Sequence, residues 1–306
     1  MTTFLLRRIL QLVPVLFGVS IAVFAMIHAI PGDPAEMVAG IDATPHDVEI
    51  VRQRLGLDQP LLQQYLIFVG NALTGDFGTS FRTGLPVSEE IMPRFYNTMV
   101  LSVAALIISV VVGFVSGVVS AVWKFSIFDN VSLLVSLIGL SMPPFFLGLV
   151  LLMVFSVDLG WFPMSGMGDW RHLVLPAVTL GLPSGAVVAR MTRSSLIDVL
   201  DQDYIRTARA KGLPEYTVVN SHAVRNALIP VITIVGLQMG FLLGGAVVCE
   251  SVFAWPGIGR LTVQAILARD FPVIQASVLL LAVIFVVVNF LTDLLYGVFD
   301  PRIKVQ

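Results

Sequence analysis

The sequence predicts an all-α integral membrane protein with six transmembrane helices and both termini in the cytoplasm. Three observations lead to this fold class. Hydrophobic residues make up 57% of the 306 positions and charged residues only 12%, whereas soluble domains contain about 25% charged residues. Six long stretches have no charged residue in their cores. Lysine and arginine are concentrated in the segments on one side of these stretches.

The first expected span covers residues 9–32, an apolar run that follows Arg7 and Arg8. A cleaved signal peptide is the competing interpretation, and the paired arginines also suggest an export signal. The run is longer than a usual signal core, however, and no small-x-small cleavage site ends it. We therefore expect an uncleaved transmembrane helix.

A polar segment follows at residues 33–97, with nine acidic and four basic residues. Thr44-Pro45 predicts a helix start and Gly56 its end, and Pro60 predicts a second helix that runs to about Leu73. One side of the second helix carries an apolar stripe: Leu61, Leu62, Tyr65, Leu66, Val69 and Leu73. This stripe is expected to pack on the membrane domain or to lie in the membrane interface. An ordinary amphipathic helix with no specific role is the alternative.

Five further spans are expected at about residues 98–122, 131–157, 173–190, 226–249 and 272–292. An aspartate, lysine or arginine at the middle of a membrane helix costs about 2.5–3.5 kcal/mol, so the absence of such residues favours spans over buried soluble helices. Several spans carry small residues four apart: Gly113 and Gly117; Gly181, Gly185 and Ala189; Gly236, Gly240 and Gly244. Such ridges are typical of closely packed membrane helices.

Orientation follows from the positions of lysine and arginine. With the amino terminus inside, eleven of the 18 basic residues lie on the cytoplasmic side: Arg7, Arg8, Lys124, Arg190, Arg193, Arg206, Arg209, Lys211, Arg225, Arg302 and Lys304. Four of the remaining seven lie in the long first loop, which carries less weight for orientation. The segment at 251–271 is then extracytoplasmic, with a turn at Trp255-Pro256-Gly257 and a short helix at 258–268. Trp255 is expected in the headgroup region.

The chain thus divides into residues 1–97, a first helix with an extracytoplasmic loop domain, and residues 98–306, a five-helix core with a cytoplasmic loop at 198–230. In this loop Asp201 and Asp203 precede a basic helix end, as the helix dipole favours. Gly212 predicts a left-handed helix end, and Pro214 the first turn of a second helix. Ala208, Ala210 and Gly212 put small residues at the bend, where another protein could approach closely.

These residues carry a resemblance to a known family. The motif DYxRTARAKGL followed by HAxRNAxxPVxT is similar to the cytoplasmic coupling loop of ABC-importer permeases in the dipeptide, oligopeptide and glutathione branch. The general loop pattern is Glu-Ala-Ala, three residues, Gly, nine residues and Ile-x-Leu-Pro. This chain has Arg206-Thr207-Ala208 and Gly212 at the first positions, but His222-Ala223-Val224-Arg225 at the last. IPGDP at 30–34, WPGIGR at 255–260 and DLLYGVFDPRI at 293–303 also resemble this branch.

The resemblance implies the type I ABC importer permease fold in a bacterial inner membrane. It also implies several partners: a second related permease in a heterodimer, two ABC ATPases, an extracytoplasmic substrate-binding protein facing the outer loops, and membrane lipid, but no nucleic acid. The ATPases would attach to a coupling loop made of Asp203, Arg206, Thr207, Ala208, Gly212, Leu213, His222 and Arg225. A basic loop that only touches anionic lipid is the simpler alternative.

No energy source is encoded in the chain. None of Lys124, Lys211 and Lys304 follows the glycine pattern of a phosphate-binding loop. We therefore expect no cofactor in this chain, with Mg-ATP bound by the partner subunits. The single Cys249 excludes an intramolecular disulfide and a cysteine-based metal cluster, and we expect it to be a packing residue.

An intramembrane enzyme is the second class considered. Gly139-x-Ser141 faintly resembles a serine nucleophile motif, but none of the four histidines lies centrally in a span where it could serve as a base. The His-Glu-x-x-His pattern of zinc peptidases is absent. No catalytic residue and no metal site are expected. Ser141 is better explained as a hydroxyl that helps to satisfy a backbone broken by Pro143-Pro144.

The third class is a stand-alone secondary carrier or channel for small solutes. Carriers driven by ions place ionisable groups inside the membrane, whereas Asp158, Glu250 and Asp293 lie at span ends here. Ser141, Gln238 and Asn289 are candidate pathway residues, although helix–helix hydrogen bonding explains the last two equally well. Within the ABC interpretation, dipeptides, oligopeptides, glutathione, nickel and other small solutes remain open. The short connection at 158–172 resembles the glutathione permease more than dipeptide permeases.

Overall fold

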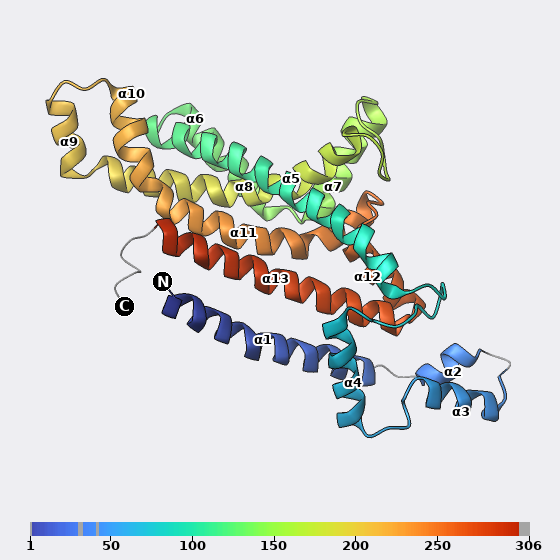
Figure 1. Cartoon of the computed structure of the whole chain (residues 1–306). Coiled ribbons are helices and arrows are strands. Elements are labelled where there is room, and N and C mark those ends of the chain that lie inside the picture. The colour runs from blue at the N-terminus through green and yellow to red at the C-terminus, as the bar shows by residue number, and fades with distance from the viewer. Residues whose placement is uncertain (1, 30–32, 41–42, 300–306) are drawn as a thin grey trace. The chain divides into compact units, whose positions relative to one another are not determined.

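The computed structural model describes residues 2–29, 33–40 and 43–299, and the regular structure of these residues is helical (Figure 1). The described residues also include one isolated β-bridge, between Thr79 and Pro86. The helices have these bounds: α1 Thr2–Ala29, α2 Pro34–Ala39, α3 Pro45–Arg54, α4 Leu61–Thr74, α5 Val87–Val122, α6 Ile127–Ser141, α7 Pro144–Leu152, η1 Met153–Asp158, α8 Arg171–Leu200, α9 Asp203–Ala210, α10 Glu215–Thr217, η2 Val218–Val224, α11 Arg225–Val252, α12 Ile258–Ala268 and α13 Phe271–Phe299.

The chain forms two compact units. The larger unit contains Asn97–Pro256 and the chain from Val287 onward, and the smaller unit contains Thr2–Tyr96 and Gly257–Val286. The first boundary, at Tyr96, lies beside the expected division at residue 97. The smaller unit also includes 257–286, a segment that the expected division had assigned to the five-helix core.

Four helical segments in the described residues are long and apolar enough to cross a membrane: Val87–Val122, Arg171–Leu200, Glu215–Val252 and Phe271–Thr292. The bent pair α6 and α7–η1 makes a fifth if it counts as one span. Helix α1 has a shorter apolar stretch at Leu10–Met26. The all-α membrane fold is therefore confirmed, whereas the count of six spans stays a prediction.

One expected span is not a single rod. Residues 131–157 were expected to form one helix, but Ile127–Ser141 and Pro144–Asp158 meet at an angle of 106°. Pro143 and Pro144 remove two backbone donors, and a residue before proline is pushed out of the helical region. Met142 accordingly has an extended backbone. The Ser141 hydroxyl donates to the Leu137 carbonyl at 2.8 Å, an ordinary bond to the residue four positions earlier, so the expected role of Ser141 at the proline break stays a prediction.

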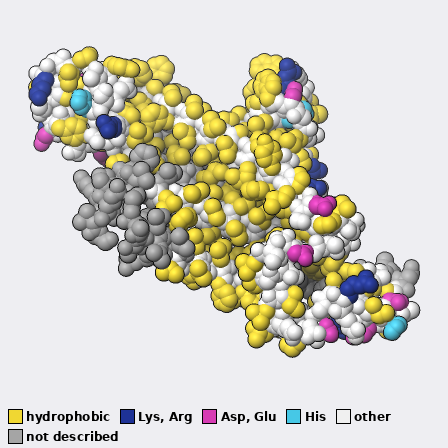
Figure 2. All heavy atoms as spheres, viewed as in Figure 1, with side chains coloured by type: hydrophobic (Ala, Val, Ile, Leu, Met, Phe, Trp, Pro, Cys, Tyr) yellow, Lys and Arg dark blue, Asp and Glu magenta, His cyan; other side chains and the backbone are white. Residues whose placement is uncertain are grey.

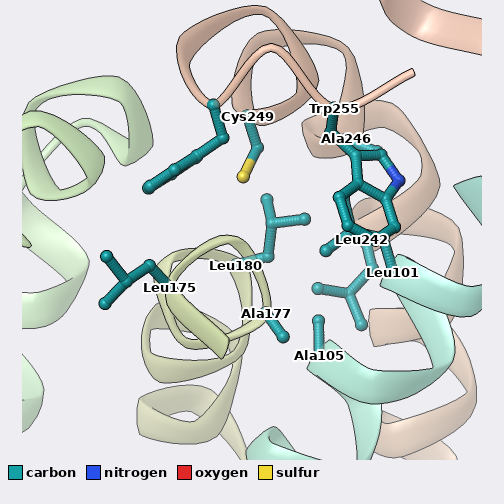
Figure 3. Packing of buried hydrophobic residues seen from close by; sticks show 10 residues of the cluster. Leu101, Ala105, Leu175, Ala177, Leu180, Leu242, Ala246, Cys249 and Trp255 are labelled. Atoms are coloured by element: carbon teal, nitrogen blue, oxygen red, sulfur yellow. The ribbon is translucent and has the colours of Figure 1, made fainter. Parts of the chain in front are cut away.

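The core of the larger unit joins α5, α8 and α11 (Figure 3). Its buried side chains are Leu101, Ala105, Leu175, Ala177, Leu180, Leu242, Ala246, Cys249, Phe253 and Trp255. Cys249 is a buried packing residue, as expected. Trp255 is not in a headgroup environment: its side chain is buried in this core, and its indole N–H donates to the Asn97 carbonyl at 3.0 Å.

The small residues of α5 and α8 bring these helices into backbone contact. A Cβ on Gly113 would lie 2.5 Å from the Gly185 carbonyl oxygen, and one on Gly117 would lie 2.6 Å from that of Ala189. A Cβ on Gly181 would lie 2.7 Å from the Ala105 oxygen. These distances confirm the predicted packing ridges of both spans, because no side chain fits at such contacts.

The glycines of α11 have different surroundings. A Cβ on Gly236 would overlap the Thr292 side chain of α13, which confirms close packing at that position. Gly244 has no atom within 4 Å of its would-be Cβ. The packing ridge expected along α11 is therefore not continuous within the described residues.

In the smaller unit, the two helices expected in the first loop are present. Thr44 and Asp47 form a reciprocal capping box at the start of α3, and the left-handed Gly56 follows its end. Pro60 is the N-cap of α4, which ends at the left-handed Gly75. The motif at 30–34 and the one at 293–303 lie partly outside the described residues.

Candidate functional site

Helix α9 is the centre of the candidate coupling site. It begins after Gln202, with Asp203 in its first turn and Arg209 in its last. A negative charge at the start and a positive charge at the end interact favourably with the helix dipole. It ends before Gly212, whose φ of 79° is the left-handed conformation expected from the sequence. Residues 198–230 therefore form the predicted helix–turn–helix (Figure 1).

One face of α9 packs on neighbouring helices of the larger unit, to which α9 itself belongs. Ile205 is fully buried and Ala208 is 8% exposed. They belong to a cluster with residues of α5, α8, η2 and α11: Ala121, Leu196, Val218, Ala223 and Ala227. The expectation that Ala208 offers its small side chain to another protein is wrong. Its small size lets α9 approach its own core.

The opposite face is free of contacts with that core. The exposed residues include the expected Asp203, Arg206, Thr207, Gly212, Leu213 and Arg225. Figure 2 shows basic side chains at the end of the unit that carries α9 and α10. Arg206 and Asp203 are 3.6 Å apart and both exposed, so this pair contributes little to stability. The charged face remains available to a partner.

An ion pair closes the turn after α9. The Arg209 guanidinium donates to both carboxylate oxygens of Glu215, at 3.1 and 2.7 Å. The Glu215 carboxylate stabilises the charged form, so the pKa of Arg209 is raised above its ordinary value. Both side chains are about half exposed. The pairing of Glu215 with Arg209 could not be predicted from the sequence, because a spacing of six does not place two residues on one helical face.

Two hydrogen bonds connect this site to the spans. The Asn226 side-chain amide donates to the Tyr204 hydroxyl at 2.9 Å and so joins α9 to α11. The Ser195 hydroxyl donates to the Ala227 carbonyl at 3.0 Å and joins α8 to α11. Neither Tyr204 nor Asn226 was singled out from the sequence, although both stand in the motif that carries the family resemblance.

His222 lies in η2, a seven-residue π-helical segment that leads into α11. Its carbonyl accepts from the Asn226 amide at 3.0 Å, and its side chain is half-buried. Wide helical turns of this kind occur often at functional sites. The segment thus connects the exposed turn to a transmembrane helix.

A buried ion pair supports the same end of the unit. Arg193 of α8 donates to both carboxylate oxygens of Asp129 in α6, at 2.7 and 2.8 Å. Asp129 is 1% exposed and also accepts from the backbone N–H of Phe125. This pair could not be predicted from the sequence, since its members stand 64 positions apart in the chain.

The three candidate pathway residues lie on three helices with different surroundings. Ser141 is exposed at the end of α6, Gln238 is 8% exposed in α11, and Asn289 is half-buried in α13. Their pathway role stays a prediction. Glu250, which the sequence places at a span end, is fully buried and accepts from the Thr98 hydroxyl at 2.5 Å.

In the smaller unit, the two expected extracytoplasmic segments are joined. The buried Asp270 carboxylate accepts from the Ser80 hydroxyl at 2.5 Å and from the backbone N–H groups of Phe81 and Arg82 at 3.1 and 3.3 Å. A cluster of buried side chains continues the contact: Val87, Ile91, Ile258, Leu261, Ala265, Phe271, Val273, Ile274 and Ala276. We name this arrangement the Asp270 clamp.

Two protein-family models match this chain. Residues 113–305 match the model of the binding-protein-dependent transport system inner membrane component, and residues 1–102 match the N-terminal region of such membrane components. The chain belongs to this family. It is a non-catalytic permease subunit of an ABC importer, in the dipeptide, oligopeptide and glutathione branch, and a multi-pass protein of the bacterial inner membrane.

Curated relatives cover the whole permease. The chain is 47% identical over 304 residues to the glutathione transport system permease protein GsiC of Escherichia coli K12, covering 99% of both chains. The GsiC protein of Shigella dysenteriae serotype 1 matches to the same extent.

Among solved structures, the inward-facing MetNI methionine ABC transporter aligns with a TM-score of 0.59 at 19% identity, over 69% of this chain and 96% of the other. A second crystal form aligns with a TM-score of 0.58, over 67% of this chain and 94% of the other. At this identity the likeness establishes the fold alone.

Proposed function

We propose that this permease forms half of the translocation pathway of an ATP-driven importer of glutathione or of peptides of similar size. The observation that carries the substrate class is the 47% identity to GsiC over 99% of both chains. The connection between η1 and α8, at residues 159–170, is short, and in this it resembles the glutathione permease more than dipeptide permeases. The resident binding protein would select the substrate first.

The proposed complex contains a second, related permease, two ABC ATPases and an extracytoplasmic binding protein. Mg-ATP would bind in the ATPases, because the sequence has no phosphate-binding loop. The exposed face of α9 would enter a cleft on one ATPase. The segments joined by the Asp270 clamp would face the binding protein.

The packing of α9 supports a coupling role. Ile205 and Ala208 lie in a cluster to which α5, α8 and α11 all contribute. A displacement of α9 therefore acts on three spans at once, because close-packed side chains transmit a movement rather than absorb it. In the proposed cycle, ATP closes the ATPase dimer and draws the coupling loops together. The spans then tilt and open the pathway toward the binding protein, and hydrolysis resets them.

This mechanism requires both termini and α9 in the cytoplasm. The test uses cysteine substitutions at exposed positions, Lys211→Cys in the loop and Asp58→Cys after α3. The native Cys249 is buried and does not compete for the label. A membrane-impermeant maleimide added to intact cells should label position 58 and leave position 211 unlabelled until the cells are lysed. Labelling of position 211 from outside would overturn the orientation.

The coupling role is tested by Gly212→Val. No atom lies within 4 Å of the would-be Cβ, but a β-branched residue is strained at a φ of 79°. The variant should distort the turn and uncouple ATP hydrolysis from uptake, while the spans remain inserted. Gly160→Val is the matched control, with a φ of 64° and equally open surroundings outside the loop. Wild-type uptake by the Gly212 variant would contradict the assignment.

The substrate is tested in proteoliposomes that contain the whole complex. Binding-protein-stimulated ATPase activity and uptake are measured with glutathione, a dipeptide, a longer peptide and nickel ions. We expect glutathione to give the largest stimulation. If another solute does so, the substrate is wrong and the importer stands. If vesicles with this chain alone accumulate solute on an ion gradient, a secondary carrier replaces the importer.

A further inference from the structure

Helix α4 contains no charged residue and presents three distinct faces. Positions that share a face recur every three or four residues. One face, which includes Tyr65 and Phe68, packs on α1 (Figure 1). A second face is exposed and largely polar: it carries Gln63, Asn71 and Thr74, together with Gly70 and Ile67. The third is an apolar stripe, formed by Leu62, Leu66, Val69 and Leu73.

The contacts with α1 fix the depth of α4 in the membrane. The Tyr65 hydroxyl lies 2.7 Å from that of Ser20, and its ring centroid lies 6.2 Å from that of Phe17. Gln64 approaches His28 at 3.2 Å. The contacted part of α1 thus runs from the middle of its apolar stretch to its carboxyl end.

The depth of these contacts follows from the distance of Ser20 to either end of α1. Ser20 lies 12 residues after Arg8 and nine before Ala29, which is about 18 Å and about 14 Å along a helix. The hydrocarbon core of a bilayer is about 30 Å thick. With α1 as the predicted first span, Ser20 therefore lies near the middle of the hydrocarbon core, and the Tyr65 side chain reaches well below the headgroups, beyond the about 5–10 Å to which interfacial helices bury their apolar face.

Polar groups on the inner side of α4 are paired, as an apolar medium requires. Ser20 pairs with the Tyr65 hydroxyl. The Gln64 amide nitrogen donates to the carbonyls of Gln59 and Leu57, at 2.8 and 3.3 Å. An unpaired amide or hydroxyl in hydrocarbon costs several kcal/mol. These pairs let α4 enter the bilayer with its polar side chains satisfied.

No residue in the described part of the chain covers the three leucines of the stripe. Leu62 is 71% exposed, Leu66 60% and Leu73 83%. A stripe of leucines opposite a polar, uncharged face matches the division between acyl chains and headgroups across one helix. The depth set by Ser20 and Phe17 places the leucines among acyl chains rather than in water.

We propose that α4 is an amphipathic helix embedded in the outer leaflet, whose Leu62, Leu66, Val69 and Leu73 contact phospholipid acyl chains. The helix thereby sets the height above the membrane of the segment at 75–86, which leads to the Asp270 clamp. Lipid is the occupant, rather than a protein, because Tyr65 of the same helix reaches acyl-chain depth on α1 and the neighbouring stripe is uncharged and exposed. This position is independent of the substrate carried.

The test places nitroxide labels on the assembled transporter in nanodiscs of bacterial phospholipids. Leu66→Cys and Leu73→Cys report the stripe, and Gln63→Cys and Thr74→Cys are matched controls on the polar face. Accessibility to oxygen, which partitions into lipid, is compared with accessibility to a water-soluble nickel chelate. Labels at 66 and 73 should collide several-fold more with oxygen than with the chelate, and those at 63 and 74 should show the reverse.

Other outcomes overturn the proposal. Strong chelate accessibility at 66 and 73 would place the stripe in water. Protection from both reagents would mean that a protein covers it, and protection that appears only with the binding protein would identify that protein as the occupant. Leu73 lies in the last turn and is the most exposed, so its substitution is the least disturbing to folding. A Leu73→Trp variant, whose fluorescence is quenched by lipids brominated at different depths, gives an independent measure of the depth of this side chain in the bilayer.

Discussion

The two polar parts of this permease, the α9 loop and the segments joined by the Asp270 clamp, are held in different ways. Helix α9 contributes two buried side chains, Ile205 and Ala208, and its turn is closed by the exposed pair of Arg209 and Glu215. The clamp has a 2% exposed carboxylate that accepts three hydrogen bonds, beside a large buried cluster.

This difference indicates different mechanical roles. Regions with few buried contacts and exposed polar bonds open at low free energy, whereas regions with buried bonds open only with the whole domain. We therefore expect the turn after α9, closed by the exposed Arg209–Glu215 pair, to open locally at a lower free energy than the clamped segments, while Ile205 and Ala208 keep α9 attached to the spans.

The largest effect is expected where the α9 end does have a buried charge. Arg193→Ala leaves the Asp129 carboxylate buried without its partner, which costs about 3–5 kcal/mol. The unfolding temperature in lipid nanodiscs should fall strongly. Adding Asp129→Asn should recover much of the loss, and Arg190→Ala, an exposed arginine of the same helix, should have little effect. An unchanged unfolding temperature would show that the pair does not support this end.

A somewhat smaller effect is expected in the clamp. Asp270→Ala removes the acceptor of three donors, and hydrogen bonds to charged groups contribute about 1.5–3 kcal/mol each before the segment relaxes. We expect a net loss of about 3 kcal/mol, faster proteolysis at residues 76–86 and weaker binding-protein affinity. Asp58→Ala, at an exposed carboxylate, is the control. If proteolysis is unchanged, the clamp is not what holds these segments.

Ile205→Ala tests the attachment of α9 itself. Truncation of a buried isoleucine costs about 2–5 kcal/mol, and we expect about 2 because α9 can settle against the gap. Uptake should fall while ATP hydrolysis continues, since the helix no longer transmits its movement to α5, α8 and α11. Thr207→Ala, on the exposed face of the same helix, should leave the unfolding temperature unchanged. Equal loss of uptake and hydrolysis in the Ile205 variant would instead indicate failed assembly.

The smallest effect is expected for Arg209→Ala. Exposed ion pairs contribute less than about 1 kcal/mol and are screened by salt. A double-mutant cycle with Glu215→Ala should give a coupling within this range that decreases at high salt. A coupling free energy of several kcal/mol would contradict the conclusion that the turn after α9 is held more weakly than the clamp.

Local chemistry predicted much of the helical structure. Thr44-Pro45 predicted the start of α3, and Gly212 predicted the left-handed turn after α9. These features depend on residues within a few positions of one another. Arg193 with Asp129 and Asp270 with Ser80 could not be predicted in this way, because each pair joins distant segments.

The sequence by itself determined that this protein lies in a membrane, which stretches are apolar enough to cross it, and which loop bears the coupling motif. These properties follow from the transfer free energy of side chains and from local backbone preference. Only the tertiary structure decided that Trp255, Glu250 and Ala208 are buried, and that the third apolar stretch is bent by 106°. Burial depends on which helices pack around a residue, and one sequence does not contain that information in any local pattern.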